Sequence, residues 1–163
     1  MHIIKKNNLL FMIKNLNIYV ATMTGTALMV ADEIEDFCKT ESIKTNIVEM
    51  DVLEPKNLED LNAPILIVSS TYGQGDVPDG SKNFYNNLKS SNMSLEHIKY
   101  AVFGLGDMTY KDTFAYGGKK FDHLFLELNA NRIGEPFYHD ASDGSLPEEE
   151  AVNWFKEKIF KLL

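Results

Sequence analysis

The sequence predicts an α/β fold, a three-layer sandwich in which a five-stranded parallel sheet has helices on both faces. Short β-branched and aromatic segments alternate with segments of helical periodicity, and two of the expected strands are apolar almost throughout. A strand that is apolar on both sides needs helices over both faces of its sheet. Glycine-rich segments follow the strands, where ligands bind in parallel sheets, so we expect function to lie in these loops.

In the first half of the chain, predicted strands and helices alternate from residue 17 onward. Residues 17–21 are predicted to form a short strand and 26–37 a helix with apolar residues at helical spacing. The pattern then predicts a strand over 45–52, a brief polar helix over 57–61 and an almost wholly apolar strand over 64–70. Three strands are thus expected before loop-rich sequence begins.

The second half continues the alternation. We expect a helix over 80–89, a buried strand over 100–104, a helix over 118–128 and a final strand over 132–138. Pro147 opens the last helix, whose first turn is acidic and whose later residues include lysines. These charges match the helix dipole, which supports the prediction of a helix here.

Length and composition indicate one domain. The chain has 163 residues, of which 44% are hydrophobic, and this suits a single hydrophobic core. We expect the domain to span residues 16–163 and residues 1–15 to be an N-terminal extension. The alternative is a start codon placed too early, with Met12 as the true start. The extension faintly resembles a signal peptide, but it is short and lacks a small-residue cleavage site.

Charge and cysteine content narrow the partners and the compartment. A net charge of −8 disfavours nucleic acid, whose phosphates are bound by clustered Lys and Arg, and favours basic protein partners. No apolar run reaches the roughly 20 residues of a membrane-spanning helix. The single cysteine, Cys38, excludes an intramolecular disulfide. We therefore expect a monomer of the reducing cytoplasm that does not bind membranes.

The scattered cysteine, histidine and tryptophan residues indicate packing rather than chemistry. Cys38 falls on a helix away from any histidine in sequence, as a buried core thiol would. His97, His123 and His139 lack metal-ligand spacing, so we expect no metal site. Trp154 stands at helical spacing with other apolar residues and is predicted to pack in the core.

Loop one, residues 21–27, joins the first strand to the first helix and is rich in hydroxyls. Thr22, Thr24 and Thr26 can donate to a phosphate, and Gly25 lets backbone approach closely. The free N–H groups and the dipole of the following helix favour an anion. Neither the P-loop pattern with its lysine nor the G-x-G-x-x-G fingerprint is present. The alternative interpretation is a threonine that merely caps the helix.

Loop two, residues 69–80, and loop three, residues 103–114, each follow an apolar strand and carry a tyrosine near glycines. Tyr72, beside Gly73, can lie flat against a planar ligand while the glycines let backbone reach the ring edge. Tyr110 supplies a second aromatic at the same edge of the sheet, so the two tyrosines can enclose one ring system. Ordinary glycine-rich turns are the alternative interpretation.

Taken together, the three loops resemble the loops of the flavodoxin family that bind flavin mononucleotide (FMN). The resemblance rests on Thr22-Met-Thr-Gly-Thr-Ala27, Thr71-Tyr-Gly-Gln-Gly-Asp76 and Phe103-Gly-Leu-Gly-Asp-Met-Thr-Tyr110. It is strongest to MioC-like proteins and to the FMN domains of diflavin reductases such as cytochrome P450 reductase and sulfite reductase flavoprotein. One departure is Tyr72, where MioC-like proteins often carry histidine. The resemblance implies that residues 16–163 form a flavodoxin-like FMN-binding domain.

The resemblance also implies a role for each loop. Loop one would hold the phosphate of FMN, and Tyr72 and Tyr110 would lie on opposite faces of its ring. Backbone of the glycines in loops two and three would meet the ring edges, and Asp140 or Asp143 would approach the ribityl chain. The cofactor-binding residues implied in this way are Thr22, Met23, Thr24, Gly25, Thr26, Ala27, Ser70, Thr71, Tyr72, Gly73, Leu105, Gly106, Asp107, Thr109, Tyr110, Phe114 and Asp140.

The function implied by the resemblance is electron transport by a free-standing flavoprotein. An NAD(P)H-dependent reductase would be the donor and a basic protein the acceptor. A flavin-dependent NAD(P)H oxidoreductase of the same fold and a flavin-free interaction module are the alternatives. A response regulator is disfavoured because the end of the first strand, Val20-Ala21-Thr22, lacks the acidic residues that would hold magnesium.

Overall fold

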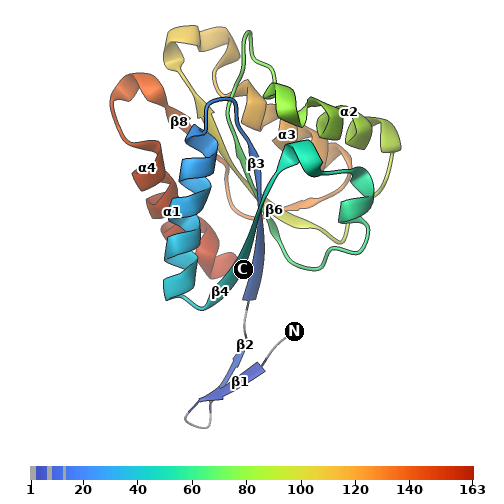
Figure 1. Ribbon diagram of the computed structural model, residues 1–163, viewed down its shortest axis with the longest axis vertical. Helices are drawn as coiled ribbons and strands as arrows, with labels where there is room; N and C mark the ends of the chain where they lie inside the picture. The colour runs from blue at the N-terminus through green and yellow to red at the C-terminus, as the bar shows by residue number, and fades with distance from the viewer. Residues whose placement is uncertain (1–2, 7–8, 13) are drawn as a thin grey trace.

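The computed structural model describes residues 3–6, 9–12 and 14–163, and its main sheet is entirely parallel (Figure 1). The order across this sheet is β4-β3-β5-β6, with β7 and β8 both beside β6. Its strands are β3 (Lys14–Ala21), β4 (Ile43–Glu49), β5 (Ile65–Ser69), β6 (Lys99–Gly106), β7 (Asn131–Arg132) and β8 (Phe137–Asp140). The expected sheet of five parallel positions is confirmed, with two short strands sharing the fifth.

Helices cover both faces of the sheet, as expected. α1 (Thr26–Thr40) and α4 (Pro147–Trp154) lie on one face, and α2 (Lys82–Ser91) and α3 (Tyr116–Glu127) lie on the other (Figure 1). Each face buries its own cluster of apolar side chains. In the described part of the chain, no helix combines the length and the apolar character needed to cross a membrane. The three-layer α/β sandwich is therefore confirmed.

The segment after β4 differs from the expected one. The strand predicted to reach residue 52 ends at Glu49, because Met50 begins a 3₁₀ turn (Met50–Val52) and buries its side chain. The brief helix predicted over 57–61 is a 3₁₀ turn at Pro55–Leu58, which opens with proline. The sequence periodicity therefore predicted the approximate positions of the strand and of the turn. It did not predict the residues at which each one begins and ends.

The final strand predicted over 132–138 is split into β7 and β8. Gly134, which lies between them, has a φ of +63°, a conformation that glycine adopts readily. The carbonyl of Glu135 accepts a hydrogen bond from the Trp154 indole N–H at 3.1 Å. The chain therefore turns toward α4 between the two strands, and β8 returns beside the end of β6.

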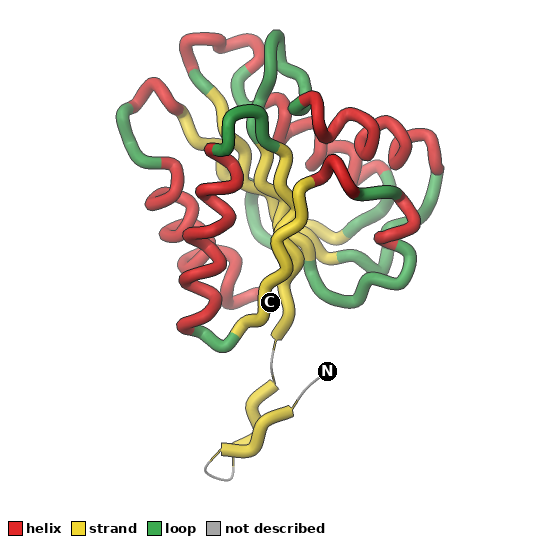
Figure 2. Tube along the Cα trace, in the orientation of Figure 1, coloured by secondary structure: helices red, strands yellow, loops and turns green. Residues whose placement is uncertain are grey.

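Residues 3–6 and 9–12 form a small second sheet. β1 (Ile3–Lys6) pairs antiparallel with β2 (Leu9–Met12), and this hairpin lies beyond the lower end of the main sheet (Figure 2). β3 begins at Lys14, two residues before the boundary expected between the extension and the domain. The sequence pattern did not predict the hairpin.

Two of the packing predictions are confirmed in the core. Cys38 is fully buried on α1, and burial, together with the charge of Glu35, raises the pKa of its thiol to about 12. A thiol with so high a pKa is a poor nucleophile. Trp154 is buried, with its ring centroid 5.7 Å from that of Phe103, and Phe137 stacks on Phe103 at 5.5 Å.

One buried polar network joins α3 to the sheet. The Tyr100 hydroxyl donates to Asp122 Oδ1 at 2.7 Å, and the Arg132 guanidinium donates to Asp122 Oδ2 at 2.8 Å. Burial, followed by the hydrogen bond and charge of Asp122, raises the pKa of Tyr100 above its usual range. The hydroxyl therefore stays protonated and remains a donor to the carboxylate.

Close backbone contact also joins α3 to β6. A Cβ built on Gly104 would lie 2.6 Å from Cδ1 of Tyr138, and one built on Gly118 would lie 2.9 Å from the Gly104 Cα. Only glycine leaves room for this approach. The contact brings the N-terminal turns of α3 against the end of β6, directly beside loop three.

Replacing Tyr100 by phenylalanine tests the polar network. Tyr100→Phe removes one donor from a buried carboxylate, so the free energy of unfolding should fall by about 1–3 kcal/mol. Urea denaturation followed by circular dichroism measures the change. Tyr110→Phe makes the same substitution at a side chain that is 66% exposed, and its stability should stay unchanged. Equal losses in both variants would contradict the role given to Asp122.

Replacing Gly104 by alanine tests the close contact. The added methyl group forces Tyr138 or the α3 backbone to move, so we expect a loss of about 1–3 kcal/mol of unfolding free energy. Thermal unfolding followed by circular dichroism detects it. Gly80→Ala is the matched control, because its Cβ would meet Asp51 Cβ at an ordinary 3.6 Å. An unchanged melting temperature for Gly104→Ala would show that the contact is easily relaxed.

Candidate functional site

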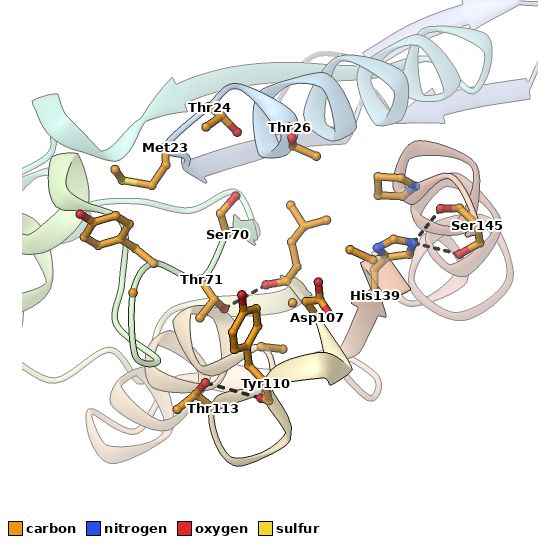
Figure 3. Close-up of a pocket in the computed structure, with 17 residues that line it drawn as sticks. Met23, Thr24, Thr26, Ser70, Thr71, Asp107, Tyr110, Thr113, His139 and Ser145 are labelled. Carbon is orange, nitrogen blue, oxygen red and sulfur yellow. Dashed lines mark hydrogen bonds between the residues drawn. The ribbon is translucent and has the colours of Figure 1, made fainter. Parts of the chain in front are cut away.

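A cavity of about 820 Å³ opens at the carboxyl edge of the main sheet. Loops one, two and three line it together with the segment that begins at the end of β8 (Figure 3). Its volume lies in the range of sites that hold small-molecule cofactors. The predicted site residues that line it are Met23, Thr24, Thr26, Ser70, Thr71, Tyr72, Gly73, Leu105, Gly106, Asp107 and Tyr110.

Other predicted site residues lie just behind the lining. Among the residues that the structure describes, those predicted for the site but outside this lining are Thr22, Gly25, Ala27, Thr109, Phe114 and Asp140. Thr22 lines a neighbouring cavity of about 110 Å³. The Ala27 side chain is completely buried in α1, and Lys119 Nζ lies 5.1 Å from the centre of the Phe114 ring. These residues belong to the same loops as the lining residues, or are bonded to them, but do not themselves line the cavity.

Loop one presents the start of α1 to the cavity. Gly25 is the N-cap residue, with a φ of +95° that favours glycine, and its N–H donates to Thr22 Oγ1 at 3.0 Å. The first turn of α1 has no acidic side chain to neutralise the positive end of the helix dipole. Thr24 and Thr26 stand at this end of the cavity (Figure 3). The arrangement suits an anion held by hydroxyls and backbone amides.

Loop two is a tight hairpin that carries Tyr72. The Tyr72 N–H donates to the Asp76 carbonyl at 2.9 Å, and the Asp76 N–H donates back to the Tyr72 carbonyl at 2.9 Å. Gly73 and Gly75, within this turn, both have positive φ. Tyr72 is 43% exposed, and Lys82 Nζ lies 5.8 Å from its ring centre. The hairpin therefore fixes the backbone while it leaves an aromatic face open.

The carboxylate of Asp76 anchors this hairpin to two helices. Burial alone would raise its pKa, but hydrogen bonds from the Val77 N–H and Lys120, with the charge of Lys82, hold the pKa below its usual range. Lys120 Nζ lies 3.3 Å and Lys82 Nζ 3.6 Å from its oxygens. Asp76 is therefore ionised at neutral pH, and two lysines offset its charge.

A single hydroxyl joins loops two and three. Thr71 Oγ1 donates to the Leu105 carbonyl at 2.9 Å and accepts from the Gly117 N–H at 3.0 Å. Loop two, loop three and the start of α3 are thereby held at one point. Thr71 was predicted as a cofactor-binding residue, and its hydroxyl is already engaged in this structural role.

Loop three is held open by two carboxylates. Asp107 Oδ1 accepts from the Thr109 N–H at 2.8 Å, and Asp140 Oδ1 accepts from the Met108 N–H at 2.9 Å. The Met108 hydrogen bond, with those from Ser142, holds the pKa of Asp140 below its usual range. Tyr110 follows these two hydrogen-bonded residues in the loop, and its side chain is largely exposed. Asp140 therefore fixes the backbone of loop three by its hydrogen bond from Met108, although it does not line the cavity itself.

The end of β8 and the segment after it supply lining residues that the sequence analysis did not select. They are His139, Ala141, Ser145 and Pro147, and Thr113 and Ala115 join them from the end of loop three. Neither Asp140 nor Asp143 is among the described lining residues, although one of them was expected to approach the ligand. The usable signal was position, because residue 139 stands at the carboxyl end of a strand, where the other loops begin.

Together these features suit the three parts of FMN. The exposed tyrosines of loops two and three match a planar ring, and the hydroxyls and amides of loop one match a phosphate. Between them lie polar groups able to meet a polyol chain. None of the described lining residues is a lysine or arginine, so the anion would be held by neutral donors. The cavity therefore fits the cofactor that the resemblance implies.

Comparison with known proteins supports the same conclusion. A family model described as flavodoxin matches residues 18–155. Flavodoxin YqcA of Escherichia coli strain K12 is 36% identical over 142 residues, which cover 87% of this chain and 94% of YqcA. The sulfite reductase [NADPH] flavoprotein alpha-component of Zymomonas mobilis is 34% identical over 149 residues, which cover 91% of this chain but 23% of that larger protein.

Solved structures agree with the sequence matches. A cysteine-to-serine mutant of flavodoxin from Pseudomonas aeruginosa superposes with a TM-score of 0.77 at 27% identity, over 88% of this chain and 95% of that one. The predicted resemblance to flavodoxins and to diflavin reductase domains is confirmed. Since the family model spans most of the chain and a relative of equal extent exceeds 30% identity, the chain belongs to the flavodoxin family.

Proposed function

We propose that this protein binds FMN non-covalently and carries electrons between redox proteins. The observation that carries the proposal is the convergence of three separate loops on one cavity, with the hydroxyl-rich start of α1 at one end and two exposed tyrosines on the loops that border it. Relatives of similar length are named flavodoxins. When bound, FMN supplies the redox chemistry, and the protein supplies binding, orientation and electrostatics.

At the phosphate end, Thr24 and Thr26 donate from their hydroxyls, and the first amides of α1 donate from the backbone. Since these donors are neutral, the helix dipole would offset only part of the phosphate charge. Thr22 holds Gly25 in the conformation that starts the helix. Loop one thus binds phosphate through geometry that exists before the ligand arrives.

At the ring end, the side chains of Tyr72 and Tyr110 would cover the flavin and limit the access of water. Gly73 and Gly106 let backbone groups meet the ring edge. A Cβ on Gly106 would lie 2.5 Å from the Ala115 nitrogen, so this position is packed on one side and needs glycine.

Charge at the cavity adjusts the redox potential. Negative charge near the ring disfavours its reduced, anionic form, and about 1.4 kcal/mol shifts a one-electron couple by about 59 mV. The charge of Asp76 is offset by two lysines, whereas Asp107 lines the cavity directly. Asp107 is therefore the carboxylate that we expect to lower the potential most.

The surface charge favours basic partners. The net charge of −8 steers encounters with a positively charged protein and mainly raises the association rate. We propose an NAD(P)H-dependent reductase as donor and a basic protein as acceptor, with this chain acting as a monomer in the cytoplasm. We also propose that residues 16–163 carry this function and that residues 1–15 are an extension outside it.

Cofactor content is the direct test of the proposed function. The purified, desalted protein should show flavin absorbance bands near ~370 and ~450 nm and release FMN on heating in near-equal amount. Mixing with NADPH or NADH alone should reduce the flavin slowly, while an added reductase should accelerate it. Rapid reduction by the nicotinamide alone would favour an oxidoreductase instead. A colourless protein that takes up no added FMN would exclude the cofactor assignment.

The phosphate site is tested by comparing FMN with riboflavin, which has the same ring and ribityl chain but no phosphate. Thr24→Val keeps the shape of the side chain and removes its hydroxyl. Because a hydrogen bond to a charged group contributes about 1.5–3 kcal/mol, FMN should bind roughly tenfold to a hundredfold more weakly. Riboflavin affinity should stay unchanged in fluorescence titrations. Thr40→Val, at the far end of α1, is the matched control and should bind FMN as the wild type does. If Thr24→Val bound FMN and riboflavin equally more weakly, the phosphate would lie elsewhere.

A further inference from the structure

His139 presents a buried ring nitrogen that has no protein partner among the described residues. The residue lies in β8 and is 3% exposed. Its Nε2 lies 2.9 Å from Ser145 Oγ and 3.2 Å from the Ser145 carbonyl oxygen. Its Nδ1 is buried, and no described group lies within hydrogen-bonding reach of it. Buried polar atoms are nearly always hydrogen-bonded, so this nitrogen needs an explanation.

The contacts of Nε2 determine what Nδ1 can do. We assign the proton of the neutral ring to Nε2, because the Ser145 carbonyl oxygen can only accept a hydrogen bond and the Ser145 hydroxyl can accept one as well. Nδ1 then carries a lone pair and acts as an acceptor. Figure 3 shows the bonds from one ring nitrogen to Ser145 and the other nitrogen on the side of the ring turned to the cavity.

The surrounding protein, as far as the structure describes it, does not supply the donor that Nδ1 requires. The carboxylates that follow His139 in sequence are engaged elsewhere: Asp140 accepts from Met108 and Ser142, and Asp143 accepts from Ser145. A carboxylate, once ionised, offers no proton to share. A group from outside the described chain that brings an O–H or N–H into the cavity would satisfy Nδ1.

We propose that His139 Nδ1 accepts a hydrogen bond from a hydroxyl of the ribityl chain of bound FMN. This inference rests on the proposed function. A phosphate at neutral pH offers mainly acceptor oxygens, whereas each ribityl hydroxyl is a donor. His139 lies on the α4 side of the cavity, apart from Tyr110 in Figure 3, so the polyol chain meets it rather than the ring. His139 is thus a binding residue for the part of the ligand that FMN and riboflavin share.

The affinities of His139 variants for FMN and for riboflavin test this contact. His139→Phe keeps a planar ring and removes the acceptor. One neutral hydrogen bond corresponds to roughly threefold to tenfold in affinity, so FMN and riboflavin should both bind about that much more weakly. His123→Phe makes the same change on the exposed surface of α3 and should alter neither affinity. His139→Gln, which can donate to Ser145 and still accept from the ligand, should recover part of the affinity.

The stability of the flavin-free protein separates binding from folding. His139→Phe removes the Nε2 contact with Ser145 as well as the unpartnered acceptor, so the flavin-free variant should melt at a modestly lower temperature. Flavin binding should still weaken at temperatures where the variant is fully folded. If His139→Phe does not fold, the comparison of His139→Gln with His139→Leu serves the same purpose.

Three results would overturn the inference. Weaker binding of FMN alone would mean a phosphate contact, and unchanged binding of both ligands would mean no contact. A loss of affinity that only follows a loss of stability would mean a structural role. All three leave the proposed function intact, whereas wild-type protein that binds neither flavin would overturn both.

Discussion

The parallel register at the carboxyl edge of the sheet is the constraint on which the site depends. Ala21 of β3 pairs with Ser69 of β5, and Ser69 pairs with Gly104 of β6. Because these strands end at the same level, the three loops that follow them start side by side. β8 extends the edge, since Leu105 pairs with His139. A shift of one residue in any pairing would turn the lining side chains to the opposite face.

The loops are held in place before any ligand is present. The Thr71 hydroxyl joins loops two and three, and the Asp140 carboxylate holds the amide of Met108. These contacts use backbone groups and leave the rings of Tyr72 and Tyr110 exposed. A site formed in advance has less conformational entropy to lose on binding, so more of the interaction energy contributes to affinity. The structure thus combines a rigid frame with an open aromatic surface.

Electrostatics separates the binding of the cofactor from the recognition of partners. The protein has a net charge of −8, yet the cavity that we assign to a phosphate has no lysine or arginine among its described lining residues. Helix N–H groups hold an anion without adding a full positive charge. In the proposed function, the negative surface would attract a basic partner and Asp107 would act on the bound ring from within the cavity. The acidic composition would then serve both the attraction of a partner and the adjustment of the ring potential.

The sequence by itself determined the α/β alternation and the three loops, because each of these features is local. Tyr72 and Tyr110 could be selected since each follows an apolar strand within a few residues of glycines. The split of the last strand depends on the indole of Trp154 reaching the Glu135 carbonyl, a contact across 19 residues. Periodicity contains no information on such a contact, so the strand was predicted as continuous. Only the tertiary structure decided that His139 lines the cavity, because its place there follows from the pairing of β8 with β6. Strand pairing and side-chain burial are long-range properties, set by the packing of the whole domain. Local sequence therefore determined which elements form, and their packing decided which side chains face the ligand.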